Sequence, residues 1–191
     1  MSTKAVPFPV PSALHRGEKE LPFVPYQQGV TFQLLQANIE AGLWVVRVRF
    51  EPGVTIQRHK HTGEVFGFTL RGAWKYLEYP EVNTAGSYLY EPAGSTHTLH
   101  VLENQKEITD AWFAIRGANL NLDDKGNVET VLDAASALEI YLAQCRQRRN
   151  ASSESDLVAA VNSPMDYAEL PLNVGVEDHA PVRLRAARGH L

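Results

Sequence analysis

The sequence predicts an all-β fold, either a sandwich or a barrel of antiparallel strands, followed by one helix. Between residues 30 and 132, short segments of strand-forming residues alternate with glycine- and proline-containing turns. Residues 43–50 show the clearest alternation, with valines and a phenylalanine on one face and two arginines on the other. Apolar residues recur at helical spacing in residues 133–149, with Asp133 placed to cap the helix.

The chain is expected to divide into four segments. Residues 1–29 contain five prolines and are expected to form an extended arm without regular structure of its own. Residues 30–132 form the β-barrel, residues 133–149 the C-terminal helix, and residues 150–191 an extended tail whose role the sequence does not define. The strands are expected at residues 30–39, 43–50, 55–61, 65–70, 74–79, 86–90, 96–102, 107–115, 119–122 and 127–132.

Composition narrows the range of partners. The 191 residues carry a net charge of −4, so the chain has no electrostatic footprint for nucleic acid. No apolar run is long enough for a membrane span, and the first 24 residues lack the apolar core of a signal peptide. With one cysteine, Cys145, no intrachain disulfide can form, and a cytoplasmic location is expected. Cys145 falls on the apolar face of the predicted helix, which favours a packing role over a nucleophilic one.

Three histidines form the strongest chemical signal. His59 and His61 are two residues apart on a predicted strand, so their side chains point to the same face. His97 follows a Pro-Ala-Gly turn on a neighbouring strand and can complete the set. Imidazole suits Zn, Cu, Fe and Ni. A His-x-His pair alone also fits a purely structural role. The spacing of the glycine and proline residues around the pair distinguishes a structural role from a metal site.

That spacing resembles the two-part signature of the cupin superfamily, G-x5-H-x-H-x3-E-x6-G and G-x5-P-x-G-x2-H-x3-N, with two residues substituted. The matching positions are Gly53, His59, His61 and Gly72 in the first part, and Gly86, Pro92, Gly94 and His97 in the second. The resemblance covers residues 43–115. It implies a cupin-type antiparallel jelly-roll barrel that holds one metal ion inside.

The two substitutions matter for the metal. Val65 stands where the cupin pattern has a metal-binding glutamate, and Val101 replaces the final asparagine. Glu64 is adjacent to Val65, but a step of one residue on a strand turns its side chain to the opposite face. The predicted ligands are therefore three neutral histidines with no carboxylate. Such a set leaves open positions and uncompensated charge for an anionic chelating substrate such as an enolate.

A closer resemblance is to the 2,4'-dihydroxyacetophenone dioxygenase family. The segments that carry it are Gly63–Val65, Gly72–Tyr79, Ala85–Ser87, His97-Thr98, Asp123–Val128 and Tyr141–Cys145. The family is similar in site type to the acetylacetone-cleaving dioxygenases, which are also three-histidine cupins. The resemblance implies Fe(II), O₂ and a small-molecule ketone, a hydroxyketone or β-diketone, cleaved at a C–C bond beside the carbonyl. The three histidines alone would also allow Zn, Ni or Cu.

One further strand supplies candidates around the metal. Trp74, Tyr76 and Glu78 alternate on one face of the predicted strand 74–79. We expect Glu78 to point into the barrel with its pKa raised by burial, as a base or as a group that orients a histidine. Tyr76 and Trp74 would line a pocket that accepts an aromatic substrate. The alternative is that Glu78 forms an ion pair at the barrel rim and that both aromatic residues belong to the core.

Two other functions stay open at this point. One is a non-catalytic metal-binding cupin of the zinc-sensor type, and the other is a metal-dependent isomerase or small-ligand binder. By analogy with other cupins we expect a homodimer or a higher homo-oligomer. The helix 133–149 is expected to cover a barrel mouth or to join that interface.

Overall fold

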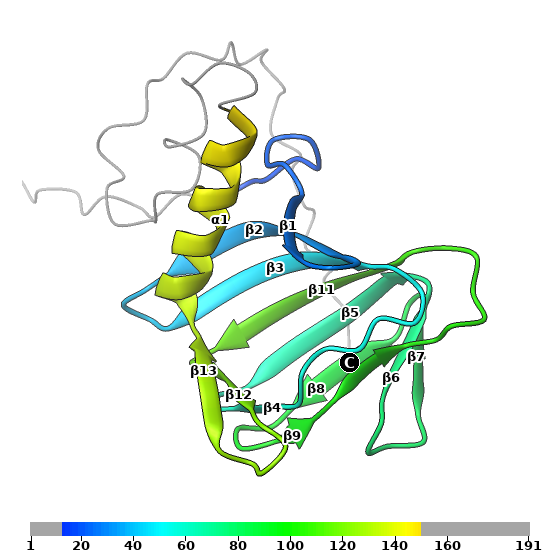
Figure 1. Cartoon of the computed structure of the whole chain (residues 1–191). Helices are drawn as coiled ribbons and strands as arrows, with labels where there is room; N and C mark the ends of the chain where they lie inside the picture. The colour runs from blue at the N-terminus through cyan, green and yellow to red at the C-terminus, as the bar shows by residue number, and fades with distance from the viewer. Residues whose placement is uncertain (1–12, 150–191) are drawn as a thin grey trace, which may run out of the picture.

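The computed structural model describes residues 13–149, and these form a β-barrel flanked by one helix (Figure 1). Every strand pair in this part of the chain is antiparallel. The elements are β1 (Val24–Gln27), β2 (Val30–Asn38), β3 (Leu43–Phe50), β4 (His59–His61), β5 (Val65–Arg71), β6 (Ala73–Tyr76), β7 (Val82–Thr84), β8 (Tyr88–Glu91), β9 (Thr96–His97), β10 (Leu99–Val101), β11 (Thr109–Arg116), β12 (Asn119–Leu122), β13 (Val128–Leu132) and α1 (Ala134–Arg149).

The strands form three sheets that enclose one core. The largest sheet has the order β1-β2-β3-β11-β5-β8, and the smaller ones have the orders β10-β6-β7 and β13-β12-β4-β9. Figure 1 shows the six-stranded sheet curving over the two smaller sheets. The predicted all-β, antiparallel jelly-roll architecture with one helix is confirmed.

The alternation in β3 separates the core from the surface as predicted. Val46 and Phe50 are buried inside the barrel. Arg47 and Arg49 point outward, where their Nε atoms lie 2.8 and 3.0 Å from the Asp110 carboxylate on the adjacent strand β11. The Arg49 guanidinium also lies 3.8 Å from the centre of the Phe23 ring. This outer contact fastens the segment before β1 to the large sheet.

The predicted arm is more ordered than expected. Residues 24–27 form β1, which pairs with β2 at the edge of the large sheet, so the prediction of no regular structure was wrong there. Proline is tolerated on edge strands because one side needs no ladder hydrogen bond, and this allows Pro25 within β1. Leu21 and Val24 are buried, and this burial holds the segment against the barrel.

Helix α1 packs beside β1 and β2 (Figure 1). Its N-terminus is capped as predicted, because the Asp133 Oδ1 atom accepts a hydrogen bond of 2.9 Å from the Ser136 backbone N–H. The Tyr141 ring meets Phe32 edge-on, and its hydroxyl donates to the Pro22 carbonyl at 2.8 Å. Cys145 is buried in the core, as predicted for a packed side chain. Among residues 13–149, no helix is long and apolar enough to cross a membrane.

Several predicted strands are shorter in the structure. The strand expected at 55–61 begins at His59, and Thr55 forms only an isolated bridge to His100. The strand expected at 74–79 ends at Tyr76, where the chain turns and the Tyr79 N–H bonds back to the Tyr76 carbonyl at 3.3 Å. Strand β7 was not predicted. The tail from residue 150 onward lies outside the described residues.

Two glycines of the cupin pattern have a clear physical role. Gly72 has a positive φ of 76°, and a Cβ there would lie 2.5 Å from the Thr109 hydroxyl oxygen. Gly94 has a φ of 88° in the turn that leads into β9 and His97. Residues with side chains rarely adopt this conformation. The glycines of the pattern therefore mark the positions of the turns that bring the histidine-bearing strands together.

Candidate metal centre

The three predicted histidines meet inside the barrel. His59 and His61 come from β4, and His97 comes from β9 directly opposite His59. All three are buried, and their ring centres lie 4.8 to 5.0 Å apart. One ligand atom from each lies within 4.8 Å of the others, and no further His, Cys, Asp or Glu in residues 13–149 joins this group by that criterion.

The donor atoms fit a divalent transition-metal ion. The Nε2 atoms of His61 and His97 lie 3.1 Å apart. Two imidazole nitrogens bound to one ion at about 2.1 Å, at angles of roughly 90 to 110°, lie about 3.0 to 3.4 Å apart. The Nδ1 atom of His59 lies 2.9 Å from the Gln57 carbonyl, which assigns its proton to Nδ1 and leaves Nε2 free to bind a metal. Burial lowers the pKa of His59 to about 4, so this ring is neutral at pH 7.

A carboxylate that the sequence analysis missed lies beside two of the histidines. The Glu91 Oε2 atom is 2.8 Å from His61 Nε2 and 3.1 Å from His97 Nε2, and the side chain is 4% exposed. Burial by itself would raise the pKa of Glu91, but the two imidazoles outweigh it and hold the pKa well below its usual range. The sequence analysis did not foresee a carboxylate this close to the histidines, and a ligand set of three histidines without a carboxylate stays a prediction.

The position of Glu91 explains how Val65 can replace the usual glutamate. Glu91 on β8 is the direct cross-strand partner of Val65 on β5. Opposite residues of an antiparallel pair point to the same face. A carboxylate is therefore present at the expected level of the barrel, but it comes from the neighbouring strand. Glu64, in contrast, is partly exposed and accepts a hydrogen bond from the Tyr90 hydroxyl, as expected for a residue outside the site.

Tyr76 holds both Glu91 and His97 in place. Its hydroxyl donates to Glu91 Oε1 at 2.5 Å, which leaves Oε2 directed at the histidines. Its ring stacks on the His97 ring at 3.7 Å between centres and 16° between planes. Burial, and then the negative charge of Glu91, raise the pKa of Tyr76 well above its usual value, so the phenol stays protonated. Tyr76 thus points inward, as predicted.

The predicted inward orientation of Glu78 was wrong. Because β6 ends at Tyr76, the alternation does not continue, and the Glu78 side chain is exposed. It accepts hydrogen bonds from the Thr98 backbone N–H at 2.8 Å and from the Thr98 hydroxyl at 2.9 Å. The small desolvation of Glu78 raises its pKa, but these donors outweigh that effect and the pKa is lowered, opposite to the prediction.

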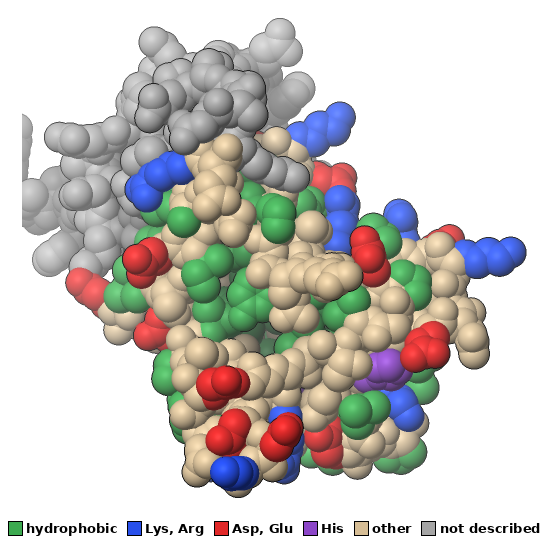
Figure 2. All heavy atoms as spheres, viewed as in Figure 1, with side chains coloured by type: hydrophobic (Ala, Val, Ile, Leu, Met, Phe, Trp, Pro, Cys, Tyr) green, Lys and Arg blue, Asp and Glu red, His purple; other side chains and the backbone are tan. Residues whose placement is uncertain are grey.

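The metal centre opens into an apolar cavity with about 120 Å³ of space for the centre of a water molecule. His59, His61, Tyr76 and Glu91 line one part of it, and most of the other lining residues are hydrophobic. In the space-filling view, hydrophobic side chains form the floor of a hollow in the face turned to the viewer (Figure 2).

Trp74, which was predicted to line the pocket, does not line the cavity. It is buried behind Tyr76, and its indole N–H donates to Thr69 at 2.9 Å, which matches the alternative of a core residue.

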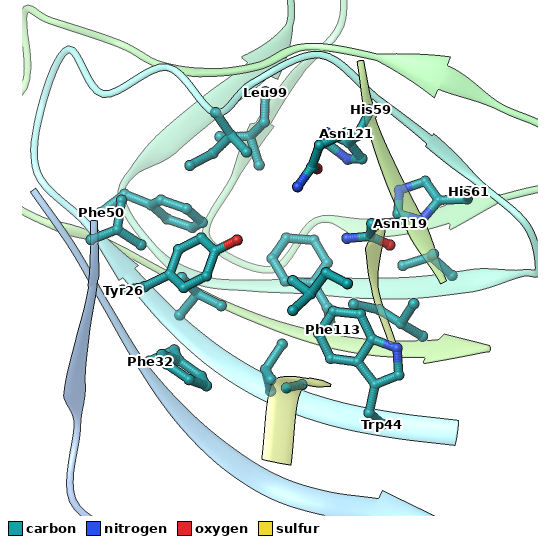
Figure 3. Close-up of a pocket in the computed structure, with 18 of the residues that line it drawn as sticks. Tyr26, Phe32, Trp44, Phe50, His59, His61, Leu99, Phe113, Asn119 and Asn121 are labelled. Atoms are coloured by element: carbon teal, nitrogen blue, oxygen red, sulfur yellow. The ribbon is translucent and has the colours of Figure 1, made fainter. Parts of the chain in front are cut away.

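Elements outside the predicted barrel complete this cavity. Tyr26 of β1 lies across the cavity from His61, with its hydroxyl pointing inward (Figure 3). Ala137 and Ile140 of α1 are also lining residues, so the helix covers the cavity, one of its two predicted roles.

Within the barrel, Asn119 and Asn121 of β12 place two side-chain amides next to the histidines in an otherwise mostly apolar wall (Figure 3).

Comparison with known proteins places this barrel in a family. The model of the ChrR cupin-like domain matches residues 14–111, about half of the chain. The chain belongs to the ChrR cupin-like family. None of the curated proteins compared with the chain matches it.

Solved structures agree with the cupin fold of this chain. A cupin from Ralstonia eutropha is 28% identical, with a TM-score of 0.66 over 69% of this chain and 85% of the other. A second protein with a cupin-like fold from the same bacterium is 30% identical, with a TM-score of 0.61 over 72% and 91%. An acetylacetone dioxygenase from Acinetobacter johnsonii is 20% identical, with a TM-score of 0.63 over 75% and 99%, and it shares the fold.

The inward orientation of Glu91 could have been predicted from the sequence of its strand. Tyr88 and Tyr90 occupy one face of the strand, and Leu89 and Glu91 occupy the other. Leu89 packs against the hydrophobic core, and the same period of two turns Glu91 inward. A glutamate two residues from an inward leucine, and six before a ligand histidine, was the pattern to recognise.

Proposed function

We propose that this cupin is a non-haem Fe(II)-dependent dioxygenase that cleaves a C–C bond beside a carbonyl group in a hydroxyketone or β-diketone. The observation that carries the proposal is the meeting of His59, His61 and His97 at one end of an apolar cavity. The shared fold with an acetylacetone dioxygenase is consistent with it. The resemblance to 2,4'-dihydroxyacetophenone dioxygenases favours iron over the other metals that imidazole binds.

The chain's own residues would perform three tasks. His59, His61 and His97 would hold the metal as neutral ligands, with His59 fixed by its hydrogen bond to the Gln57 carbonyl. Glu91 would add one negative charge beside His61 and His97, and Tyr76 would fix its orientation. Because Oε2 faces the nitrogens that would bind the metal and Oε1 accepts the hydrogen bond from Tyr76, we assign Glu91 the role of charge partner and not that of the base.

Iron(II) would act as a Lewis acid that favours ionisation of the chelated ketone, and it would activate O₂ for reaction with the substrate. The hydrophobic walls would exclude water from the electron-rich form of the substrate. Both oxygen atoms enter the products, so an α-hydroxyketone gives two carboxylic acids when the bond between its carbonyl and carbinol carbons breaks. The predicted homodimer stays a prediction.

The test is oxygen uptake by anaerobically iron-loaded protein. Aryl hydroxyketones and β-diketones are added singly, O₂ consumption is followed with an electrode, and acids are identified by mass spectrometry. The proposal expects one O₂ consumed per substrate cleaved, and no uptake by the zinc-loaded protein. Iron-loaded protein that consumes no O₂ with any member of the panel, while zinc occupies the site of protein purified from cells, would favour a non-catalytic metal-binding cupin.

A further inference from the structure

Two rungs of the β4–β12 ladder, separated by one other pair, each join a candidate ligand histidine to an asparagine. Asn121 lies opposite His59, and Asn119 lies opposite His61. Opposite residues in an antiparallel pair project to the same face, with Cβ atoms about 4.5 to 5.5 Å apart. Figure 3 shows both asparagines beside these histidines at the edge of the cavity.

On the first rung, His59 and Asn121 each form a hydrogen bond with a different residue. The Nδ1 atom of His59 lies 2.9 Å from the Gln57 carbonyl. The side-chain amide of Asn121 donates to the Thr130 hydroxyl at 2.8 Å. His59 therefore has its orientation set without help from Asn121.

On the second rung the complementary groups are both unpaired. His61 Nδ1 and Asn119 Oδ1 are buried polar atoms without a hydrogen-bond partner. Leaving a buried donor or acceptor unpaired costs about 1 to 3 kcal/mol. One of these atoms can carry a proton, and the other can only accept one.

We propose that Asn119 is the positioning residue for His61, accepting a hydrogen bond from its Nδ1–H through Oδ1 when the Nε2 atom binds metal. Both atoms are bonded to the Cγ of directly opposed side chains, so a modest side-chain rotation brings them together. Metal at Nε2 requires the proton at Nδ1, and ligand histidines almost always donate that proton to an oxygen. Asn119 Oδ1 is the unpaired oxygen on the residue that faces His61.

This inference rests on the three-histidine metal site and not on the oxygen chemistry proposed for it. Loss of the oxygen that accepts from a ligand histidine typically lowers metal affinity about 10- to 100-fold. Asn119 should therefore affect zinc binding, whatever reaction the site performs.

Zinc affinity of the full chain, measured by competition with a chromophoric chelator, tests the inference. Asn119→Leu keeps the size of the side chain and removes the acceptor, so affinity should fall about 10- to 100-fold. Asn119→Asp keeps an oxygen acceptor and should bind zinc at least as tightly as the wild type. Asn121→Leu is the matched control on the other histidine rung, and its zinc affinity should stay within about twofold, because the Gln57 carbonyl already fixes His59. Thermal unfolding of each metal-free variant checks that it folds.

A second readout follows the proton itself. Long-range ¹H–¹⁵N spectra of the zinc-loaded wild type should show His61 protonated at Nδ1 with a hydrogen-bonded proton signal, and Asn119→Leu should lose that signal. Asn119→Leu binding zinc within twofold of the wild type, or Asn121→Leu losing as much affinity, would overturn the inference. A chain that shows the expected zinc affinities but consumes no O₂ would contradict the dioxygenase proposal and leave this one standing.

Discussion

Two glutamates near the histidines, Glu91 and Glu78, differ in their exposure to solvent and in their hydrogen-bond partners. Glu91 is 4% exposed, contacts His61 and His97, and accepts a hydrogen bond from the Tyr76 hydroxyl. Glu78 is exposed and accepts two hydrogen bonds from Thr98, a neighbour of His97 in the chain. Both have lowered pKa values, but imidazoles lower that of Glu91 and surface hydrogen bonds lower that of Glu78.

The comparison shows that strand boundaries decide which carboxylate reaches the three histidines. Glu78 lies two residues beyond the end of β6, so the alternation that would turn it inward has already stopped. Glu91 is the last residue of β8, and the alternation still holds there. Substitutions at the two positions should therefore have effects of very different size.

The largest effect is expected for Glu91→Gln. Glutamine keeps the shape and an acceptor for the Tyr76 hydroxyl, but it removes the negative charge beside His61 and His97. Metal affinity should fall about 10- to 100-fold, the range typical of groups that support ligand histidines. Chelator competition with Zn²⁺ measures this. An affinity within twofold of the wild type would mean that Glu91 plays no part in the site.

A smaller effect is expected for Tyr76→Phe, which keeps the ring on His97 and removes the hydroxyl. Glu91 Oε1 then loses its donor inside the core, at a cost of about 1.5 to 3 kcal/mol for a hydrogen bond to a charged group. Urea unfolding of the metal-free protein should show this as a lower midpoint with an unchanged slope. A variant as stable as the wild type would mean that the hydrogen bond to Glu91 contributes nothing.

The smallest effect is expected for Glu78→Gln. Its metal affinity should equal that of the wild type, which makes it the control for Glu91→Gln. Because the folded-state pKa of Glu78 lies below 4.5, its charge stabilises the fold above that pH, and the contribution disappears as the pH falls through the folded-state pKa. Any stability difference between Glu78→Gln and the wild type should therefore be present at pH 7 and be lost as the pH falls through the lowered folded-state pKa. A fall in metal affinity would restore Glu78 as a member of the site.

Local patterns in the sequence were enough to predict most of the fold and the three histidines. The alternation in residues 43–50 matched β3, and the i, i+2 spacing of His59 and His61 brought both rings to one point. The glycine spacing marked where the turns fall. Each of these signals is short-range, and side-chain direction follows directly from it.

Contacts between distant strands could not be predicted in the same way. Val65 and Glu91 are partners only because β5 pairs with β8 in a register that no local pattern specifies. Tyr26 reaches the cavity because β1 joins the sheet edge, although its proline-rich surroundings predicted no regular structure. The same limit applies to Asn119, whose relation to His61 depends on the register of β12 against β4.

The most direct test of the three-histidine site is metal stoichiometry. The protein is stripped with chelator, titrated with Zn²⁺, and its metal content is measured by mass spectrometry, alongside alanine variants of His59, His61, His97 and, as a control, His100, which is partly exposed and contacts the Thr55 hydroxyl. The structure predicts one ion per chain in the wild type and in His100→Ala, and a loss of tight binding in each of the other three. A wild type that binds no metal, or single variants at His59, His61 and His97 that still bind one ion tightly, would contradict it.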